Sequence, residues 1–293
     1  MTEKYPKPTI NIDRYAVIGN PISHSKSPQI HAAFAKQTGQ QLSYEAILAP
    51  IDSFAAVIKN LIAQGYKGAN ITVPFKNEAF AHCDNLSERA FAAGAVNTLT
   101  FENGKINGDS LISGDTLING DNTDGVGLVN DIKLNLKHGL RGARILLLGA
   151  GGAAQGVLLP LINAQPASIT IANRSLEKAH FMVQKVAAQH AVCNLSVSNY
   201  ENLQSGFDVI INATSTGLSD ASLPISPTIF AKNCLAYDMM YGLETPFMAQ
   251  ARAAGAQVAD GLGMLAEQAA EAFYVWRGVR PETAPVIKMI RTD

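Results

Sequence analysis

The chain has 293 residues, of which 47% are hydrophobic and 16% are charged, a composition typical of a globular protein with an ample core. Its 23 basic and 24 acidic residues nearly cancel, so no field exists to attract a nucleic acid or an anionic membrane, and neither partner is expected. Because the length exceeds that of the usual single core, two domains are predicted.

The first half of the chain alternates strand and helix signals. A helix is expected at residues 28–36, with Ser27 as its N-cap, a proline at its first position and Gly39 as its stop. Short apolar or β-branched runs predict strands at residues 15–18, 43–48, 69–73 and 97–101. This alternation predicts an α/β domain with a mostly parallel sheet.

Two polar residues of this half suggest chemistry. Lys76 follows a strand-like run that is turned by Pro74, so its ammonium is expected at the carboxyl end of a strand, where open α/β sheets bind ligands. Asp124 lies in a turn-rich stretch just before an apolar run. Singly, the ordinary interpretations are a surface lysine and a helix N-cap. Together, a lysine beside a carboxylate can exchange a proton with an alcohol or carbonyl, as a hydride-transfer enzyme requires.

A glycine-rich turn at the centre of the chain favours the second interpretation. The apolar run 144–148 leads into a G-x-G-x-x-A pattern, and a further strand is expected at 168–172. In this pattern Gly149 allows a tight turn, Gly151 lets the backbone approach a pyrophosphate, and Ala154 permits close packing of helix on strand. A helix starting there offers free N–H groups to phosphates. The predicted dinucleotide site therefore includes Gly149, Ala150, Gly151, Gly152 and Ala153.

The end of the next strand bears on the choice of dinucleotide. NAD sites usually place an acid there to bind the ribose 2'-hydroxyl, whereas NADP sites replace the acid and supply cations. This chain has Asn173, Arg174 and Ser175 at that position and Lys178 one helical turn on. Cations at a helix start oppose the helix dipole unless an anion is bound, so these residues favour NADP as the cofactor.

The remaining elements complete a two-domain prediction. Two further strands and two final helices are expected at residues 207–211, 234–238, 264–276 and 285–290. The predicted fold is α/β with an N-terminal, mostly parallel α/β substrate domain and a doubly wound Rossmann NADP domain. With the last helices folded back on the first domain, the substrate-binding and catalytic domain and the NADP-binding domain are assigned to residues 1–123 plus 262–293 and to residues 124–261.

From about Tyr15 to its end, the chain resembles the shikimate dehydrogenase family. The resemblance is carried by ordered motifs: VIGNPISHSKSP at residues 17–28, NITVPFK at 70–76, GAVNT at 94–98, GDNTDGVG at 120–127, the glycine turn, NATS at 212–215 and DGLGML at 260–265. It implies the reversible, NADPH-dependent reduction of 3-dehydroshikimate to shikimate in aromatic amino acid biosynthesis.

The same resemblance implies roles for individual residues. Lys76 and Asp124 are implied as the catalytic pair, and Ser25 and Ser27 as the groups that hold the substrate carboxylate. The residues implied to bind the remaining polar groups of the substrate are Thr72, Asn97, Asp124, Tyr241 and Gln268. Those implied to lie near the nicotinamide are Glu88, Met239 and Gly261. Uncharged polar side chains suit a polyhydroxylated ring acid, because each buried hydroxyl needs a partner.

Two features depart from the family. An I-x-G-D unit recurs every six residues, and only its third copy continues into the Asp124 motif. We interpret the copies as a duplication that lengthened a surface hairpin, because a hexapeptide β-helix needs more repeats to bury a core. A calcium loop is not expected, since Gly120 stands where the first acidic ligand would be. Gln155 occupies a place where many relatives have arginine, which predicts slightly weaker phosphate binding.

Two alternative functions stay open. A quinate/shikimate dehydrogenase with relaxed cofactor use would favour an acid at the end of the second Rossmann strand. A non-catalytic NADP-sensing module would not need Lys76 and Asp124 together. The three cysteines are far apart and no apolar leader is evident, so a cytoplasmic monomer or homodimer with a small-molecule substrate and no metal is expected.

Overall fold

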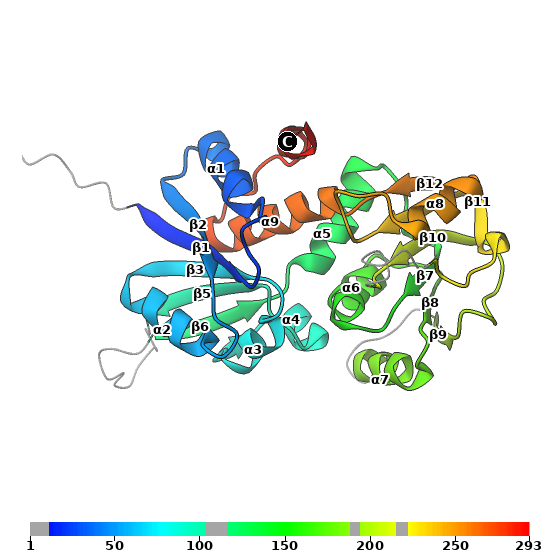
Figure 1. Cartoon of the computed structure of the whole chain (residues 1–293), viewed down its shortest axis with the longest axis horizontal. Helices are drawn as coiled ribbons and strands as arrows, with labels where there is room; N and C mark the ends of the chain where they lie inside the picture. The colour runs from blue at the N-terminus through cyan, green and yellow to red at the C-terminus, as the bar shows by residue number, and fades with distance from the viewer. Residues whose placement is uncertain (1–11, 104–115, 188–193, 215–221, 293) are drawn as a thin grey trace, which may run out of the picture.

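Two six-stranded sheets, each flanked by helices, form the two lobes of the molecule (Figure 1). The computed structural model describes residues 12–103, 116–187, 194–214 and 222–292. Strands of residues 13–121 form the first sheet, and strands of residues 144–259 form the second. The predicted α/β fold with two mostly parallel sheets is confirmed.

The first sheet has the strand order β2-β1-β3-β5-β6-β4 and is parallel except for β5. Its strands are β1 (Asp13–Gly19), β2 (Leu42–Leu48), β3 (Tyr66–Ile71), β4 (Asn85–Leu86), β5 (Thr98–Asn103) and β6 (Thr116–Asp121). β3 ends two residues earlier than expected, because the chain turns where the Phe75 N–H donates to the Thr72 carbonyl at 3.0 Å. The mostly buried strands β1 and β3 lie inside the sheet, as their apolar residues require.

The helices of the first lobe are α1 (Ser27–Thr38), α2 (Phe54–Ala63), α3 (Lys76–Ala81) and α4 (Glu88–Ala93). The prediction that Ser27 is the N-cap of α1 is wrong: Lys26 is the N-cap, and Ser27 is the first helical residue. The Ser25 hydroxyl, two residues earlier, accepts the Ser27 N–H at 3.3 Å and so satisfies a free donor at the helix start. The predicted stop is confirmed, because Gly39 adopts a left-handed φ of 67°.

The hairpin of β5 and β6 carries the last copy of the hexapeptide repeat. The two strands are paired from Thr98 and Asp121 at one end to Asn103 and Thr116 at the other. The first two copies, within residues 104–115, lie outside the described residues, so their origin as a lengthened hairpin stays a prediction. The third copy, residues 118–123, begins inside β6 and leads directly to Asp124.

The second sheet is parallel throughout, in the order β12-β11-β10-β7-β8-β9. Its strands are β7 (Arg144–Leu148), β8 (Ser168–Ala172), β9 (Asn194–Ser198), β10 (Phe207–Asn212), β11 (Phe230–Asp238) and β12 (Gln257–Ala259). Its helices are α6 (Gly152–Asn163), α7 (Leu176–Ala187), the 3-10 turn η3 (Pro227–Ile229) and α8 (Pro246–Ala253). The strand order reverses between β7 and β10, which is the point at which doubly wound sheets bind ligands.

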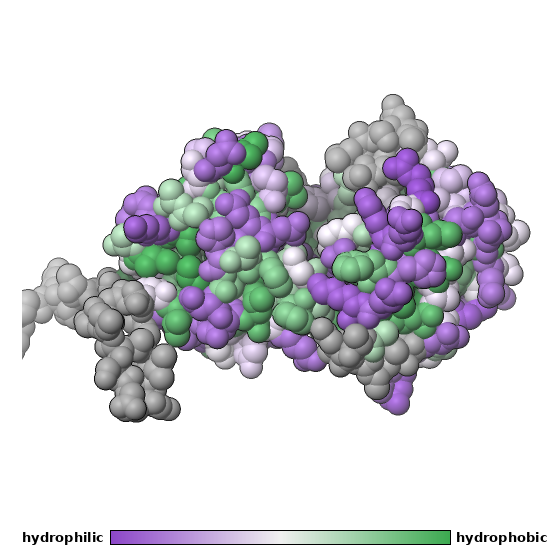
Figure 2. Space-filling model, turned by 90° about the horizontal axis from the view of Figure 1, so that it is seen from below, coloured by the Kyte–Doolittle hydropathy of each residue, from purple (hydrophilic) through white to green (hydrophobic). Residues whose placement is uncertain are grey.

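Two long-range helix contacts connect the lobes. α5 (Asp124–Asn130) continues into the π-helical turn η1 (Asp131–Asn135) and packs against α9 (Leu262–Arg277). α9 and α10 (Ala284–Thr292) share a buried apolar cluster with α1, which includes Ile30, Phe34, Ala266 and Phe273. The final helices therefore fold back on the first lobe. An indentation separates the two lobes when the molecule is seen from below (Figure 2). Among the described helices, none has the length and apolarity that a membrane span requires.

Candidate active site

Lys76 and Asp124 meet at one edge of the first sheet. Lys76 is the first residue of α3, after β3, and Asp124 is the first residue of α5, after β6. β3 and β6 are each antiparallel to β5 and therefore parallel to one another, so their carboxyl ends lie at the same edge. The Lys76 Nζ lies 2.6 Å from Asp124 Oδ2, and the two side chains are 32% and 18% exposed. The pair is thus charge-assisted and still open to a substrate.

Asn97 holds Asp124 from the opposite side. Its Nδ2 donates to Asp124 Oδ1 at 2.7 Å and to Thr123 Oγ1 at 3.0 Å, while its Oδ1 accepts the Thr123 N–H at 2.9 Å. Gln268, on α9, places its Oε1 3.4 Å from the same Asn97 amide. The structure therefore brings Lys76, Asn97, Asp124 and Gln268 into one cluster, with each carboxylate oxygen of Asp124 facing a donor.

A buried chain of polar groups leads from this cluster toward the serines. Asn70 Nδ2 donates to the Asn97 carbonyl at 3.1 Å, and Asn70 Oδ1 accepts the Tyr44 hydroxyl at 2.7 Å. Burial raises the pKa of Tyr44 well above its usual value, and a hydrogen bond with Ser27 opposes the rise. The sequence motifs predict no role for Tyr44 or Asn70. The only available signal was that Asn70 opens the motif that ends at Lys76.

The other predicted substrate residues lie at the start of α1 or in turns that follow strands. Ser27 is buried, and Ser25 and Thr72 are half-buried in the turns after β1 and β3. Tyr241, after β11, is 37% exposed, and burial of its ring raises the pKa of its hydroxyl. No hydrogen bond within the described residues joins Ser25, Thr72 or Tyr241 to Lys76 or Asp124.

A cavity of about 880 Å³ lies over the glycine-rich turn of the second lobe. All of the predicted turn and strand-end residues line it: Gly149, Ala150, Gly151, Gly152, Ala153, Asn173, Arg174, Ser175 and Lys178. Five further lining residues were not predicted to bind the cofactor: Glu177, Phe181, Tyr200, Ala213 and Thr214. Thr214 follows β10, the neighbour of β7, so its position at a strand's carboxyl end was a usable signal. The size suits a large cofactor.

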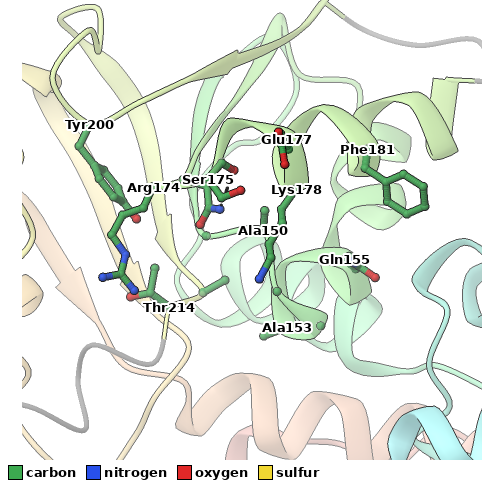
Figure 3. A pocket seen from close by; sticks show the side chains of 15 residues that line it. Ala150, Ala153, Gln155, Arg174, Ser175, Glu177, Lys178, Phe181, Tyr200 and Thr214 are labelled. Carbon is green, nitrogen blue, oxygen red and sulfur yellow. Dashed lines mark hydrogen bonds between the residues drawn. The ribbon is translucent and has the colours of Figure 1, made fainter.

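The residues present fit a dinucleotide phosphate. Gly149 has a φ of 107°, which favours glycine, and nothing lies within 4 Å of the position where a side chain at Gly151 or Gly152 would start. α6 begins at Gly152, so its free N–H groups face open space. Lys178 points toward the glycine turn, whereas Arg174 lies beside Tyr200 and Thr214 (Figure 3). The described lining has Glu177 as its one acid.

The three residues implied near the nicotinamide do not line this cavity. Glu88 lines a second pocket of about 470 Å³ between α4, α5 and α6. Met239 and Gly261 are in close contact: a side chain at Gly261 would collide with the Met239 carbonyl. Gln155, at the place where relatives carry arginine, lines the main cavity. Arg174 and Lys178 follow a strand of the second sheet, whereas Lys76 and Asp124 follow strands of the first sheet.

A Rossmann-type cavity and a lysine–carboxylate pair on the facing lobe define a dinucleotide-dependent oxidoreductase. Comparison with known proteins makes the class specific. Three family models match residues 17–99, 132–219 and 261–291: the shikimate dehydrogenase substrate binding domain, shikimate/quinate 5-dehydrogenase and the shikimate 5'-dehydrogenase C-terminal domain. The chain belongs to the shikimate dehydrogenase family.

Individual relatives agree over nearly the whole chain. A shikimate dehydrogenase (NADP(+)) of Methylobacillus flagellatus is 56% identical over 282 residues, which cover 96% of this chain and 99% of that protein. The crystal structure of an Ael1 enzyme from Pseudomonas putida is 46% identical with a TM-score of 0.86, covering 94% of this chain and 97% of that one. The shikimate 5-dehydrogenase of Thermus thermophilus, solved with NADP(H) and shikimate, is 31% identical with a TM-score of 0.80, covering 96% and 99%.

Proposed function

We propose that this protein reversibly reduces 3-dehydroshikimate to shikimate with NADPH. The observation that carries the proposal is the 2.6 Å contact between Lys76 and Asp124, at a sheet edge beside Asn97 and Gln268. Family membership and 56% identity to a shikimate dehydrogenase (NADP(+)) support the same activity. A non-catalytic NADP-binding module would have no use for this pair.

The catalytic roles follow from charge and geometry. When bound, NADPH supplies a hydride from its nicotinamide C4 to the substrate carbonyl carbon. Lys76 faces the developing oxygen anion as a cation, and the pair it forms with Asp124 delivers the proton that completes the alcohol. Asp124 holds the ammonium in place and is itself held by Asn97.

Substrate binding is assigned to polar groups around the pair. Ser25 and Ser27, at the start of α1, would hold the carboxylate through their hydroxyls. Thr72, Asn97, Asp124, Tyr241 and Gln268 would bind the ring hydroxyls and the carbonyl. Uncharged donors and acceptors suit this task because a buried substrate hydroxyl without a partner costs about 1 to 3 kcal/mol.

Cofactor binding is assigned to the large cavity. The glycine turn and the N-terminus of α6 would bind the pyrophosphate, and Arg174 and Lys178 would bind the 2'-phosphate. Asn173 and Ser175 flank this position, while Glu88, Met239 and Gly261 would lie on the nicotinamide side. Residues 124–261 would form the NADP domain, and residues 1–123 plus 262–293 the substrate domain.

The cellular setting is part of the proposal. A small-molecule substrate, a reducing cytoplasm and a monomeric or homodimeric state fit the near-zero net charge and the free cysteines Cys83 and Cys234.

The test is absorbance at the NADPH band during oxidation of shikimate and of quinate, each with NADP+ and with NAD+. We expect turnover with shikimate and NADP+ to exceed the other three combinations. Equal rates with quinate or with NAD+ would support the relaxed quinate/shikimate activity named by one of the matching family models. No turnover with any combination, in a sample that binds NADP+, would support the sensing module.

A further inference from the structure

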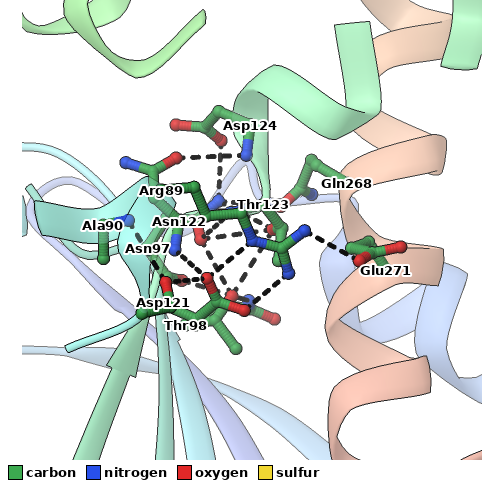
Figure 4. Close-up of polar contacts among 12 residues, drawn as sticks. Arg89, Ala90, Asn97, Thr98, Asp121, Asn122, Thr123, Asp124, Gln268 and Glu271 are labelled. Carbon is green, nitrogen blue, oxygen red and sulfur yellow. Dashed lines mark hydrogen bonds and ion pairs between the residues drawn. The ribbon is translucent and has the colours of Figure 1, made fainter. Parts of the chain in front are cut away.

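Arg89, on α4, has no hydrogen bond to the Lys76–Asp124 pair, yet its guanidinium connects the end of β6, which leads to Asp124, with α9, which carries Gln268. Nε and Nη2 donate to the two oxygens of Asp121, at 2.7 and 2.5 Å, and Nη1 donates to Glu271 Oε1 at 2.8 Å. Asp121 ends β6 and Glu271 lies on α9 (Figure 4). One planar cation thus joins a strand end and a helix that come from distant parts of the sequence.

The Asp121 side of this contact sets the position of Asp124. Asp121 Oδ1 also accepts the Asn122 N–H at 2.7 Å and the Ser87 hydroxyl at 2.5 Å. The Asn122 side chain in turn accepts the Asp124 N–H at 3.2 Å and donates to the Ala95 carbonyl at 3.0 Å. Arg89 is therefore one of the groups that hold the first residue of the corner formed by residues 121–124.

The Glu271 side sets the position of Gln268. Glu271 lies three residues after Gln268 on α9, and Gln268 reaches Asn97, the residue that holds Asp124. Arg280 supplies a second cation to Glu271, so this carboxylate is paired on both oxygens. A shift of α9 relative to α4 would therefore move Gln268 away from the pair.

The three side chains of this contact are largely buried, so their charges need well-aligned partners. The side chains of Arg89, Asp121 and Glu271 are 21%, 14% and 13% exposed. Burial raises the pKa of Asp121, but hydrogen bonds and charge from Arg89 outweigh it and hold that pKa below its ordinary value. A lysine has the charge of arginine but not its rigid fork, so it cannot bind both oxygens of Asp121 and reach Glu271 at once.

We propose that Arg89 is a positioning residue for the reaction: it acts through Asp121 and Glu271 to hold Asp124 and Gln268 at the distances that proton transfer requires. The kinetic test of this role rests on the proposed function. The contacts of Arg89 with Asp121 and Glu271 do not depend on that function. The test of this role therefore has a kinetic arm and a crystallographic arm.

The kinetic arm compares wild type, Arg89→Ala, Arg89→Lys and the control Arg144→Ala in shikimate oxidation. Arg144 also donates to both oxygens of an aspartate, Asp208, but on the exposed edge of the other lobe. We expect kcat to fall at least about tenfold in both Arg89 variants while the KM for NADP+ stays within about twofold, because Arg89 does not line the cofactor cavity. Millimolar guanidinium should restore part of the kcat of Arg89→Ala and leave Arg144→Ala unchanged.

A folded Arg89→Lys enzyme with kcat within about twofold of wild type would overturn the proposal, whatever the fate of Arg89→Ala. The crystallographic arm uses Arg89→Lys without substrate. We expect the contact between Lys76 and Asp124 to lengthen beyond hydrogen-bond distance, and an unchanged 2.6 Å contact would also overturn the proposal. A wild type that is inactive on shikimate would defeat the proposed function alone, because the crystal structure still decides the role of Arg89.

Discussion

His31 gives this protein a pH-dependent weakness that can be calculated from its surroundings. The ring lies on α1, is fully buried and stacks on Tyr44 with centroids 4.1 Å apart and an interplanar angle of 6°. Neither ring nitrogen has a hydrogen-bond partner within the described residues. Burial therefore lowers the pKa of His31 from 6.5 to about 3, and the nearby Asn70 opposes the shift only in part.

The sign of the effect follows from proton counting. Between pH 6.5 and pH 3 the unfolded chain holds a proton on His31 that the folded chain lacks, so the free energy of unfolding falls as the pH falls through this window. A pH of 5 lies about 1.5 units below the pKa of His31 in the unfolded chain. At 1.36 kcal/mol per unit, this lowers the free energy of unfolding by about 2 kcal/mol. At pH 7 the cost is close to zero.

The assay is urea unfolding at pH 7 and pH 5 of wild type, His31→Phe and the control His180→Ala, which replaces an exposed histidine of α7. The phenylalanine keeps an aromatic ring against Tyr44 and removes the titrating group. We expect His31→Phe to lose about 2 kcal/mol less than wild type between the two pH values. If wild type and His31→Phe lose the same amount, His31 is not the buried neutral ring described here.

Four further outcomes are expected. Lys76→Ala should lower kcat by about 10²- to 10⁴-fold with little change in shikimate affinity; near-normal kcat with a raised KM would make Lys76 a binding residue only. Arg174→Ala should weaken NADP+ by roughly ten- to a hundredfold, from about 1.5 to 3 kcal/mol of charge-assisted bonding, and NAD+ much less; equal losses in kcat/KM would exclude contact with the 2'-phosphate. Residues 110–115 form one repeat unit between the paired ends of β5 and β6, and their deletion should leave Tm and activity nearly unchanged. A loss of shikimate affinity at constant Tm would show that the insert reaches the substrate site. Gly263→Ala should lower Tm by several degrees, because its methyl group would overlap the buried Asp131 carboxylate; an unchanged Tm would mean that Asp131 moves freely.

Local patterns determined much of this protein. The run 144–148 followed by glycines predicted a strand, a turn and the start of a helix, and all three are present, with α6 beginning at Gly152. Gly39 ended α1 where expected, because only its lack of a side chain makes the left-handed conformation cheap. The cations Arg174 and Lys178 were predicted as neighbours of the glycine turn, since the ends of adjacent parallel strands meet at one edge.

Other features depended on contacts between distant segments. β5 was predicted from its residues, but no local signal stated that it runs antiparallel between β3 and β6, which is what brings Lys76 and Asp124 to the same edge. Ser27 was misassigned because the cap of α1 depends on where the preceding turn places Ser25.

The polar network shows the same division most clearly. Tyr44, Asn70 and Arg89 carried no motif-level sign of their partners, which lie 26 to 182 residues away in the chain. The sequence determined which residues can form strands, turns and charged pairs, because those properties depend on a few neighbouring backbone and side-chain groups. The tertiary structure decided which polar groups are removed from water together, and only burial makes such partners obligatory.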